Sequence, residues 1–146
     1  MTETETSRTE SPAQNRPITP FEMIGGVEPI RRVVDAFYDL LESDPQYAEL
    51  RAMHAPDLAP MREALCGFFT GWMGGSRDWF NARGGFCVMT RHAKMPVTEK
   101  TAQQWNDALR AALAAAQVEP GFAAQMDQIL TRLAAGMVRG QKNAGI

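Results

Sequence analysis

The sequence predicts an all-α domain. Apolar residues recur at helical spacing in four substantial segments, and no segment alternates polar and apolar residues over a useful length. Glycine pairs and prolines stand between these segments, where they are expected to end one helix and begin the next. The chain has 146 residues, which is enough for one such domain.

The two ends of the chain are expected to lie outside the folded domain. Residues 1–18 are rich in Thr, Glu, Ser, Gln and Arg and carry almost no aliphatic side chains. Such a segment buries too little apolar surface to offset the entropic cost of ordering, so it is predicted to be a disordered tail. The domain is expected over residues 19–140, and residues 141–146 are predicted to form a flexible C-terminus.

The first helix is predicted to be short and the second long. Thr19 caps a helix start in which Pro20 takes the first position and Glu22 completes a capping box. Gly25-Gly26 then end this helix after little more than a turn. The apolar positions of the long helix that follows fall on one face: Ile30, Val33, Val34, Phe37, Tyr38 and Leu41.

A brief helix and another long one are predicted next. Asp44-Pro45 is typical of a cap and a first helical residue, and the helix it begins is expected to run through about Arg51. Asp57 is expected to cap the long helix, which Gly74-Gly75 end. The apolar stripe of this helix consists of Leu58, Met61, Leu65, Phe68, Phe69 and Trp72.

The rest of the chain is predicted to form an irregular connection and two more helices. Residues 76–90 lack clean periodicity, and a connection of this length is usually functional in a compact domain. The next helix begins near Pro96 and Thr98, and the last begins at Pro120 and frays near Gly140. Their inward residues are expected to be Ala102, Trp105, Leu109, Ala112, Leu113 and Ala116, then Phe122, Met126, Ile129, Leu130, Leu133 and Met137.

Composition argues against several classes of function. The formal net charge is −2 and the pI is about 5.7, so neither nucleic acid nor an anionic membrane is expected as the main partner. No apolar run approaches the roughly 18–20 residues of a membrane span. The polar N-terminus does not resemble a secretory signal, and Cys66 and Cys87 are interpreted as core thiols of a reducing compartment, so a cytoplasmic location is expected.

Standard catalytic and metal motifs are also missing from the sequence. The patterns HExxH, GxSxG, GxxxxGK[ST] and GxGxxG do not occur, and no close cluster of His, Cys or carboxylate residues has the spacing of a zinc site. The two cysteines form neither a CxxC pair nor a haem-attachment motif. Any haem would therefore be held without a covalent bond to the chain.

His92 is the candidate metal ligand. A lone histidine is more often structural, but His92 lies between Arg91 and Lys94, just before a helix start marked by Pro96. A haem needs an imidazole on its iron and cations near its propionates, and the arginine guanidinium suits a carboxylate. The alternative interpretation of the two cations is a solvated basic edge.

Three further residues carry a hydrogen-bond donor on separate elements: Tyr38, His54 and Trp105. Their donors could converge on a bound polar ligand, but each residue could equally be part of the core or of a helix corner. The apolar residues Met61, Leu65, Phe68 and Phe69 are suited to the core and to one wall of a flat apolar pocket.

With these residues identified, the chain resembles the group II truncated haemoglobins from Pro20 to about Leu113. No single motif is decisive, but two Gly-Gly stops, Arg91-His92 and a tryptophan thirteen residues later form a specific combination. The segments that carry the resemblance are Gly25-Gly26, residues 33–38, residues 50–58, Phe68-Phe69, residues 71–75, residues 91–93 and Trp105.

The resemblance implies a two-over-two helical sandwich, with short extra helices, around haem b. His92 matches the proximal histidine and Arg91 a position that commonly pairs with a propionate. Tyr38 and Trp105 match the distal donors, and His54 falls at the corner beside the ligand. Met61, Leu65 and Phe69 match the distal helix; Phe68 and Lys94 complete the expected haem contacts. Residues 84–90 depart from the family's usual Gly-His-Pro with basic residues and imply a more apolar haem edge.

Several functions are compatible with such a site. The leading hypothesis is reversible binding of O2 and similar ligands, with CO, NO, cyanide and peroxide as further candidates. The second is a redox enzyme, an NO dioxygenase or a peroxidase, which would need an external reductase because no flavin or NAD domain is evident. A third is a haem-free helical interaction module. Tyr38 or His54 could also occupy the sixth iron position, and the protein could be a monomer or a homodimer.

Overall fold

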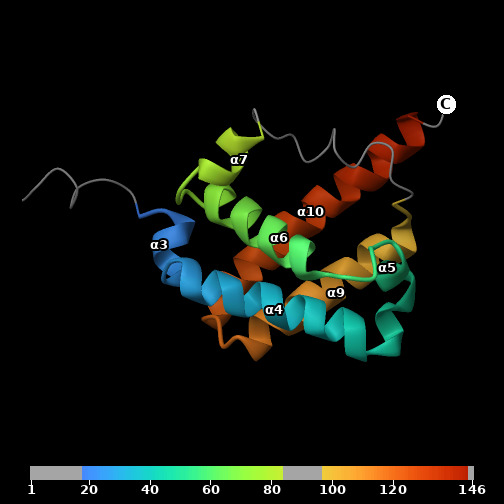
Figure 1. Ribbon diagram of the computed structural model, residues 1–146, viewed down its shortest axis with the longest axis horizontal. Helices are drawn as coiled ribbons and strands as arrows, with labels where there is room; N and C mark the ends of the chain where they lie inside the picture. The colour runs from blue at the N-terminus through green and yellow to red at the C-terminus, as the bar shows by residue number, and fades with distance from the viewer. Residues whose placement is uncertain (1–17, 84–96, 145–146) are drawn as a thin grey trace, which may run out of the picture.

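The computed structural model describes residues 18–83 and 97–144, with only the backbone for residues 139–144. These ranges contain helices and no strand, which confirms the predicted all-α class. The elements are α3 (Pro20–Ile24), α4 (Val27–Ser43), the 3-10 helix η1 (Pro45–Tyr47), α5 (Ala48–Ala52), α6 (Ala59–Trp72), α7 (Asp78–Ala82), α9 (Glu99–Ala115) and α10 (Pro120–Ala144) (Figure 1).

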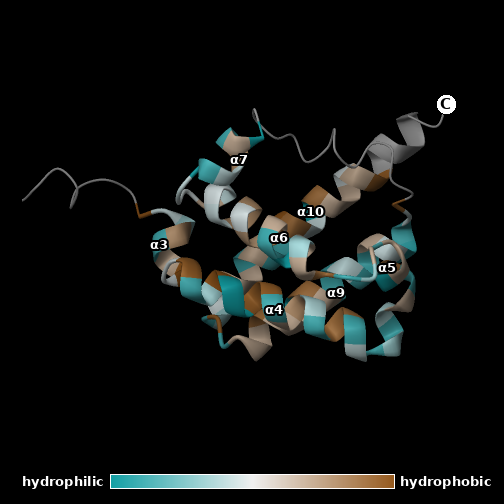
Figure 2. Ribbon diagram, in the orientation of Figure 1, coloured by the Kyte–Doolittle hydropathy of each residue, from teal (hydrophilic) through white to brown (hydrophobic). Residues whose placement is uncertain are grey.

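The four long helices form two layers. Helix α4 packs against α6 in one layer, and α9 packs against α10 in the other, while α4 also lies along α9 and joins the layers (Figure 1). The short elements η1 and α5 pack on both α4 and α9. Figure 2 shows brown and teal segments alternating along α4, as expected for a helix with one buried face.

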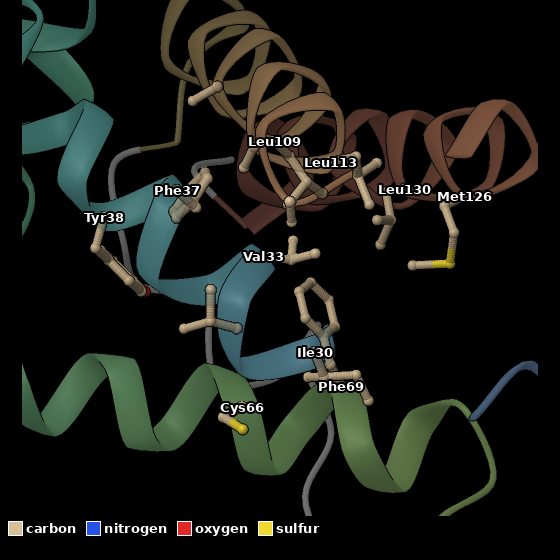
Figure 3. Close-up of a cluster of buried hydrophobic side chains, with 14 of the residues drawn as sticks. Ile30, Val33, Phe37, Tyr38, Cys66, Phe69, Leu109, Leu113, Met126 and Leu130 are labelled. Carbon is tan, nitrogen blue, oxygen red and sulfur yellow. The ribbon is translucent and has the colours of Figure 1, made fainter. Parts of the chain in front are cut away.

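The core lies where these four helices meet. Figure 3 shows Ile30 and Val33 of α4 near Phe69 of α6, with Leu113 and Leu130 approaching from the other layer. The largest fully buried side chains are Phe37, Phe69, Ile30, Leu113, Leu130 and Val34. Each apolar residue predicted on the inner face of α4 is buried, so the helical periodicity of that segment predicted its packing correctly.

The predicted helix signals are largely present as hydrogen bonds. Thr19 and Glu22 form the reciprocal capping box of α3, and Gly25 ends that helix in the left-handed region at φ 107°. The Asp44 side chain accepts from the backbone N–H of Gln46 at the start of η1. Thr98 caps α9. These local contacts confirm the predicted beginnings of the two short elements and of α9.

Helix α7 was not predicted, because five residues are too few to show a period. It lies inside the segment expected to be irregular; residues 84–90 of that segment are outside the described residues. Glycines let it approach α6 closely: a Cβ on Gly67 would lie 2.4 Å from the Trp79 ring, and one on Gly71 would lie 2.4 Å from Phe80. Trp79 and Phe80 therefore pack directly on the backbone of α6.

One prediction for the last helix is wrong. Ile129 was expected to point inward but is 45% exposed. Helix α10 packs mainly against α9, so the buried stripe is narrower than that of a central helix and excludes Ile129. None of the helices in the described ranges combines the length and hydrophobicity needed to cross a bilayer.

Candidate functional site

The structure brings the three predicted donor residues into one group of rings. Tyr38 lies 5.8 Å from His54 and 4.9 Å from Phe37 between ring centroids, and Phe37 lies 6.0 Å from Trp105. All three contacts are edge-to-face, the preferred arrangement for aromatic pairs. We call His54, Tyr38, Phe37 and Trp105 the ring chain. It links α4, the corner after α5, and α9.

Tyr38 is a buried residue of the ring chain. The side chain is 2% exposed and extends from α4 toward α6 (Figure 3). Burial raises the pKa of the phenol to about 12, and the nearby positive charge of Arg62 opposes this shift. Within the described part of the chain no hydrogen bond contributes to that pKa. A neutral phenol has one O–H, and that of Tyr38 is suited to donate to a ligand.

Arg62 of α6 lies over the Tyr38 ring and forms ion pairs with α4. The guanidinium carbon lies 5.8 Å from the Tyr38 ring centroid. The same group binds Asp35 at 3.1 Å, Asp39 at 2.8 Å and Glu42 at 3.2 Å, all on successive turns of α4. Sequence reasoning missed Arg62, because a charged residue beside an apolar stripe usually lies on a solvated face.

His54 and Trp105 occupy the two ends of the ring chain. The His54 Nδ1 atom lies 2.9 Å from the carbonyl oxygen of Leu50, one turn earlier in the chain. Trp105 is half-buried and packs against both apolar clusters of the core, including the small one formed by Ala102, Ala134 and Val138. The indole of Trp105 is therefore fixed by packing on several sides.

The four apolar residues predicted as a pocket wall all lie on α6 but differ in exposure. Phe69 is fully buried in the core, and Leu65 is partly buried against it. Phe68 is buried and stacks on Trp72 at 6.0 Å between centroids, on the side of α6 that meets α7. Met61 is 37% exposed. Leu65 and Phe69 thus belong to the inner face of α6, whereas Met61 lies at its edge.

Three of the predicted haem contacts, His92, Arg91 and Lys94, lie outside the described residues, as do Cys87 and the departure at residues 84–90. Within the described ranges no group of three or more His, Cys, Asp or Glu side chains is suited to a metal ion. The described residues therefore supply the apolar and hydrogen-bonding parts of the candidate site.

Those residues suit a haem. A flat apolar macrocycle needs an apolar wall, a role that side chains of the kind found on α6 suit, and its small polar ligand needs donors in dry surroundings. Tyr38, which is buried, and Trp105, which is half-buried, each carry one hydrogen-bond donor. A groove of about 310 Å³ between α4, α6 and α7, lined by Arg31, Glu63 and Cys66 among others, includes none of the predicted ligand-site residues.

Comparison with known proteins agrees with this fold. Residues 19–139 match the family described as bacterial-like globin. No curated protein sequence matches the chain.

Solved structures of haemoglobins match it well. The haemoglobin of Chloroflexus aurantiacus is 32% identical, with a TM-score of 0.74 over 83% of this chain and 98% of that one. The group II 2-on-2 haemoglobin of Agrobacterium tumefaciens is 26% identical, with a TM-score of 0.78 over 84% and 95%. The group II truncated haemoglobin of Bacillus anthracis is 28% identical, with a TM-score of 0.77 over 84% and 92%. The chain belongs to the bacterial-like globin family, as a truncated haemoglobin of group II with haem b as its cofactor.

Proposed function

We propose that this globin binds O2 and similar diatomic ligands reversibly and retains O2 by hydrogen bonds from Tyr38 and Trp105. The observation that carries the proposal is the Tyr38 side chain, which is 2% exposed and whose phenol stays neutral because its pKa is raised, with no hydrogen bond to it from the described residues. Haem b supplies a ferrous iron on which such ligands bind. The haem itself would be held by His92 on the iron and by Arg91 and Lys94 at the propionates.

The two donors would stabilise the negative charge on bound O2. O2 held in such a site carries partial negative charge on its outer atom, whereas CO carries much less. A hydrogen bond to a charged acceptor in dry surroundings is stronger than one to a neutral acceptor. Tyr38 and Trp105 would therefore slow the release of O2 and leave the release of CO nearly unchanged. Slow release suits retention or redox chemistry better than bulk delivery.

Replacing the donors tests this proposal. In Tyr38→Phe and in Trp105→Phe, O2 release is expected to be about 5- to 30-fold faster, because each lost bond contributes about 1–2 kcal/mol. Stopped-flow displacement of O2 by CO measures the rate. Tyr47→Phe is the matched control, since Tyr47 is also buried but belongs to η1 and not to the ring chain. Equal release rates in wild type and both ring-chain variants would contradict the donor roles.

The iron ligand has its own test. His92→Ala is expected to lose the Soret band or to shift it greatly, because the imidazole bond to iron is removed. Absorption spectra of the purified protein before and after adding haemin measure this. His54→Ala removes the other histidine of the chain and shows whether that residue contributes to the spectrum. If His92→Ala keeps the wild-type spectrum, another residue holds the iron.

A further inference from the structure

One ring nitrogen of His54 has a defined role in the structure. Nδ1 lies 2.9 Å from the carbonyl oxygen of Leu50. A carbonyl oxygen only accepts hydrogen bonds, so the proton of this contact must belong to Nδ1. A neutral imidazole carries a single N–H, and the partner of one nitrogen sets the state of the other. Neutral His54 therefore presents a lone pair, and no proton, at Nε2.

Leu50 is held in place by a residue from a distant helix. The backbone N–H of Leu50 donates to Oε1 of Gln104 at 3.0 Å, across 54 positions of sequence. Leu50 lies in the first turn of α5, where backbone donors lack helical partners. The N-cap residue Tyr47 makes no side-chain bond to that turn. Gln104, which is 9% exposed on α9, caps α5 in its place.

The orientation of the Gln104 amide is fixed as well. Its Nε2 donates to Oε1 of Glu49 at 2.7 Å, and the other carboxylate oxygen accepts from Lys100 at 3.1 Å. A carboxylate cannot donate, so the nitrogen of the amide must face Glu49 and the oxygen must face Leu50. These bonds, together with the low exposure of Gln104, make a rigid link from α9 to the backbone beside His54.

We infer that Gln104 is a positioning residue for His54: it holds Leu50, and the Leu50 carbonyl locks the imidazole in the Nδ1–H form. His54 then acts in the ring chain as a hydrogen-bond acceptor, not as a donor to the ligand. With its ring 5.8 Å from Tyr38 and perpendicular to it, His54 shapes the electrostatics around the phenol. Of the three donor residues predicted from the sequence, Tyr38 and Trp105 are then the ones that donate to O2. This inference rests on the proposed function only for that last assignment.

Nuclear magnetic resonance of the ring nitrogens tests the lock. The probe is ¹⁵N-histidine-labelled, haem-loaded protein in the diamagnetic ferrous form with CO. His54 is expected to show a protonated Nδ1 and an unprotonated Nε2. In Gln104→Leu both bonds of the amide are lost, and His54 is expected to show a mixture of the two tautomers. Gln103→Leu is the matched control, because Gln103 is exposed on the same helix and its side chain donates to Asp107, away from α5.

Exchanging the residues at positions 49 and 104 distinguishes loss of the hydrogen bonds from a general folding defect. Gln104→Glu alone sets two carboxylates against each other and is expected to loosen the lock. Adding Glu49→Gln exchanges the amide and the carboxylate, so Leu50 keeps an acceptor and the side-chain bond returns. The double variant is expected to recover the wild-type nitrogen spectrum. An Nε2–H tautomer in the wild type, or an unchanged spectrum in Gln104→Leu, would overturn the inference.

O2 release separates this inference from the proposed function. His54→Phe is expected to release O2 no faster than the wild type, because the neutral ring offers no proton to the ligand. Acceleration like that of Tyr38→Phe would mean that His54 is a donor, which overturns the role given to it here. Failure of Tyr38→Phe and Trp105→Phe to change release contradicts the proposed function, yet it leaves the nitrogen spectra as an independent test of the lock.

Discussion

At the scale of single residues, chemistry depends on which partner each polar atom has. The Tyr38 side chain is 2% exposed and has no hydrogen bond from the described residues, and the pKa of its phenol is raised to about 12 mainly by burial. The Nδ1–H group of His54 donates to the carbonyl oxygen of Leu50. Tyr38 and His54 both look like donors in the sequence, but they are placed to act differently. The N–H of His54 already donates to the protein backbone.

The raised pKa of Tyr38 predicts a loss of stability in alkali. The folded chain keeps the phenol proton up to about pH 12, whereas the unfolded chain releases it near the ordinary value of 10.0. Between these values the folded state binds more protons, so the free energy of unfolding falls as pH rises. In this pH range the free energy of unfolding of the wild type should fall more steeply with pH than that of Tyr38→Phe, by up to about 1.4 kcal/mol per pH unit.

Urea unfolding followed by far-UV circular dichroism, in steps from about pH 9 to about pH 11.5, measures that difference. Burial also raises the pKa of Tyr47, but Tyr47 is present in both proteins and its effect cancels. Parallel curves for wild type and Tyr38→Phe would show that the phenol is not protected from solvent.

At the scale of elements, helix ends and helix contacts determine where the ring chain lies. Gln104 caps α5 from another helix, and Arg62 binds three acidic residues of α4. The end of α9 contains a strained position: Gln117 has φ 61°, in the left-handed region that favours glycine. The backbone N–H groups of Gln117 and Val118 bond back to Ala114 and Leu113, so this turn is part of the helix end.

Gln117→Gly is expected to stabilise the protein by about 1 kcal/mol, because a residue with a Cβ pays roughly 1–2 kcal/mol in this conformation and glycine does not. Chemical denaturation at constant pH measures the change. Ala111→Gly, at an exposed and fully helical site of α9, is the control and is expected to destabilise by about 1 kcal/mol. A loss of stability in Gln117→Gly would show that its side chain has a structural role.

Contacts between residues close in sequence could be predicted from the sequence, whereas contacts between distant residues could not. Caps at Thr19, Asp44 and Thr98 act within a few residues, so composition and spacing located those helix beginnings. The apolar periodicity of α4 likewise predicted which of its residues are buried. The bond between Gln104 and Leu50 joins distant positions, and such a pair has no signature in a single sequence. The roles of Gln104 and Arg62 could only come from the structure.

At the scale of the whole molecule, the cofactor and the fold are linked. The haem would bind the folded chain and not the unfolded one, so bound haem must stabilise the fold by mass action. Removing haem is expected to lower the melting temperature, and haemin at about 100 times its Kd should restore about 2.7 kcal/mol. Thermal unfolding at increasing haemin concentrations measures this, with His92→Ala expected to respond less. A melting temperature that does not depend on haemin would contradict the link.

The contacts of Arg62 have a consequence for how small molecules enter the protein. Separating α6 from α4 beside Tyr38 requires the breaking of three ion pairs of Arg62. The side chains of the three acidic partners are 47–69% exposed, so dissolved ions have access to them. Dissolved ions weaken exposed pairs of this kind. Any passage that opens between these two helices therefore becomes easier at high ionic strength. An uncharged gas could then enter this protein at a rate that depends on the salt concentration.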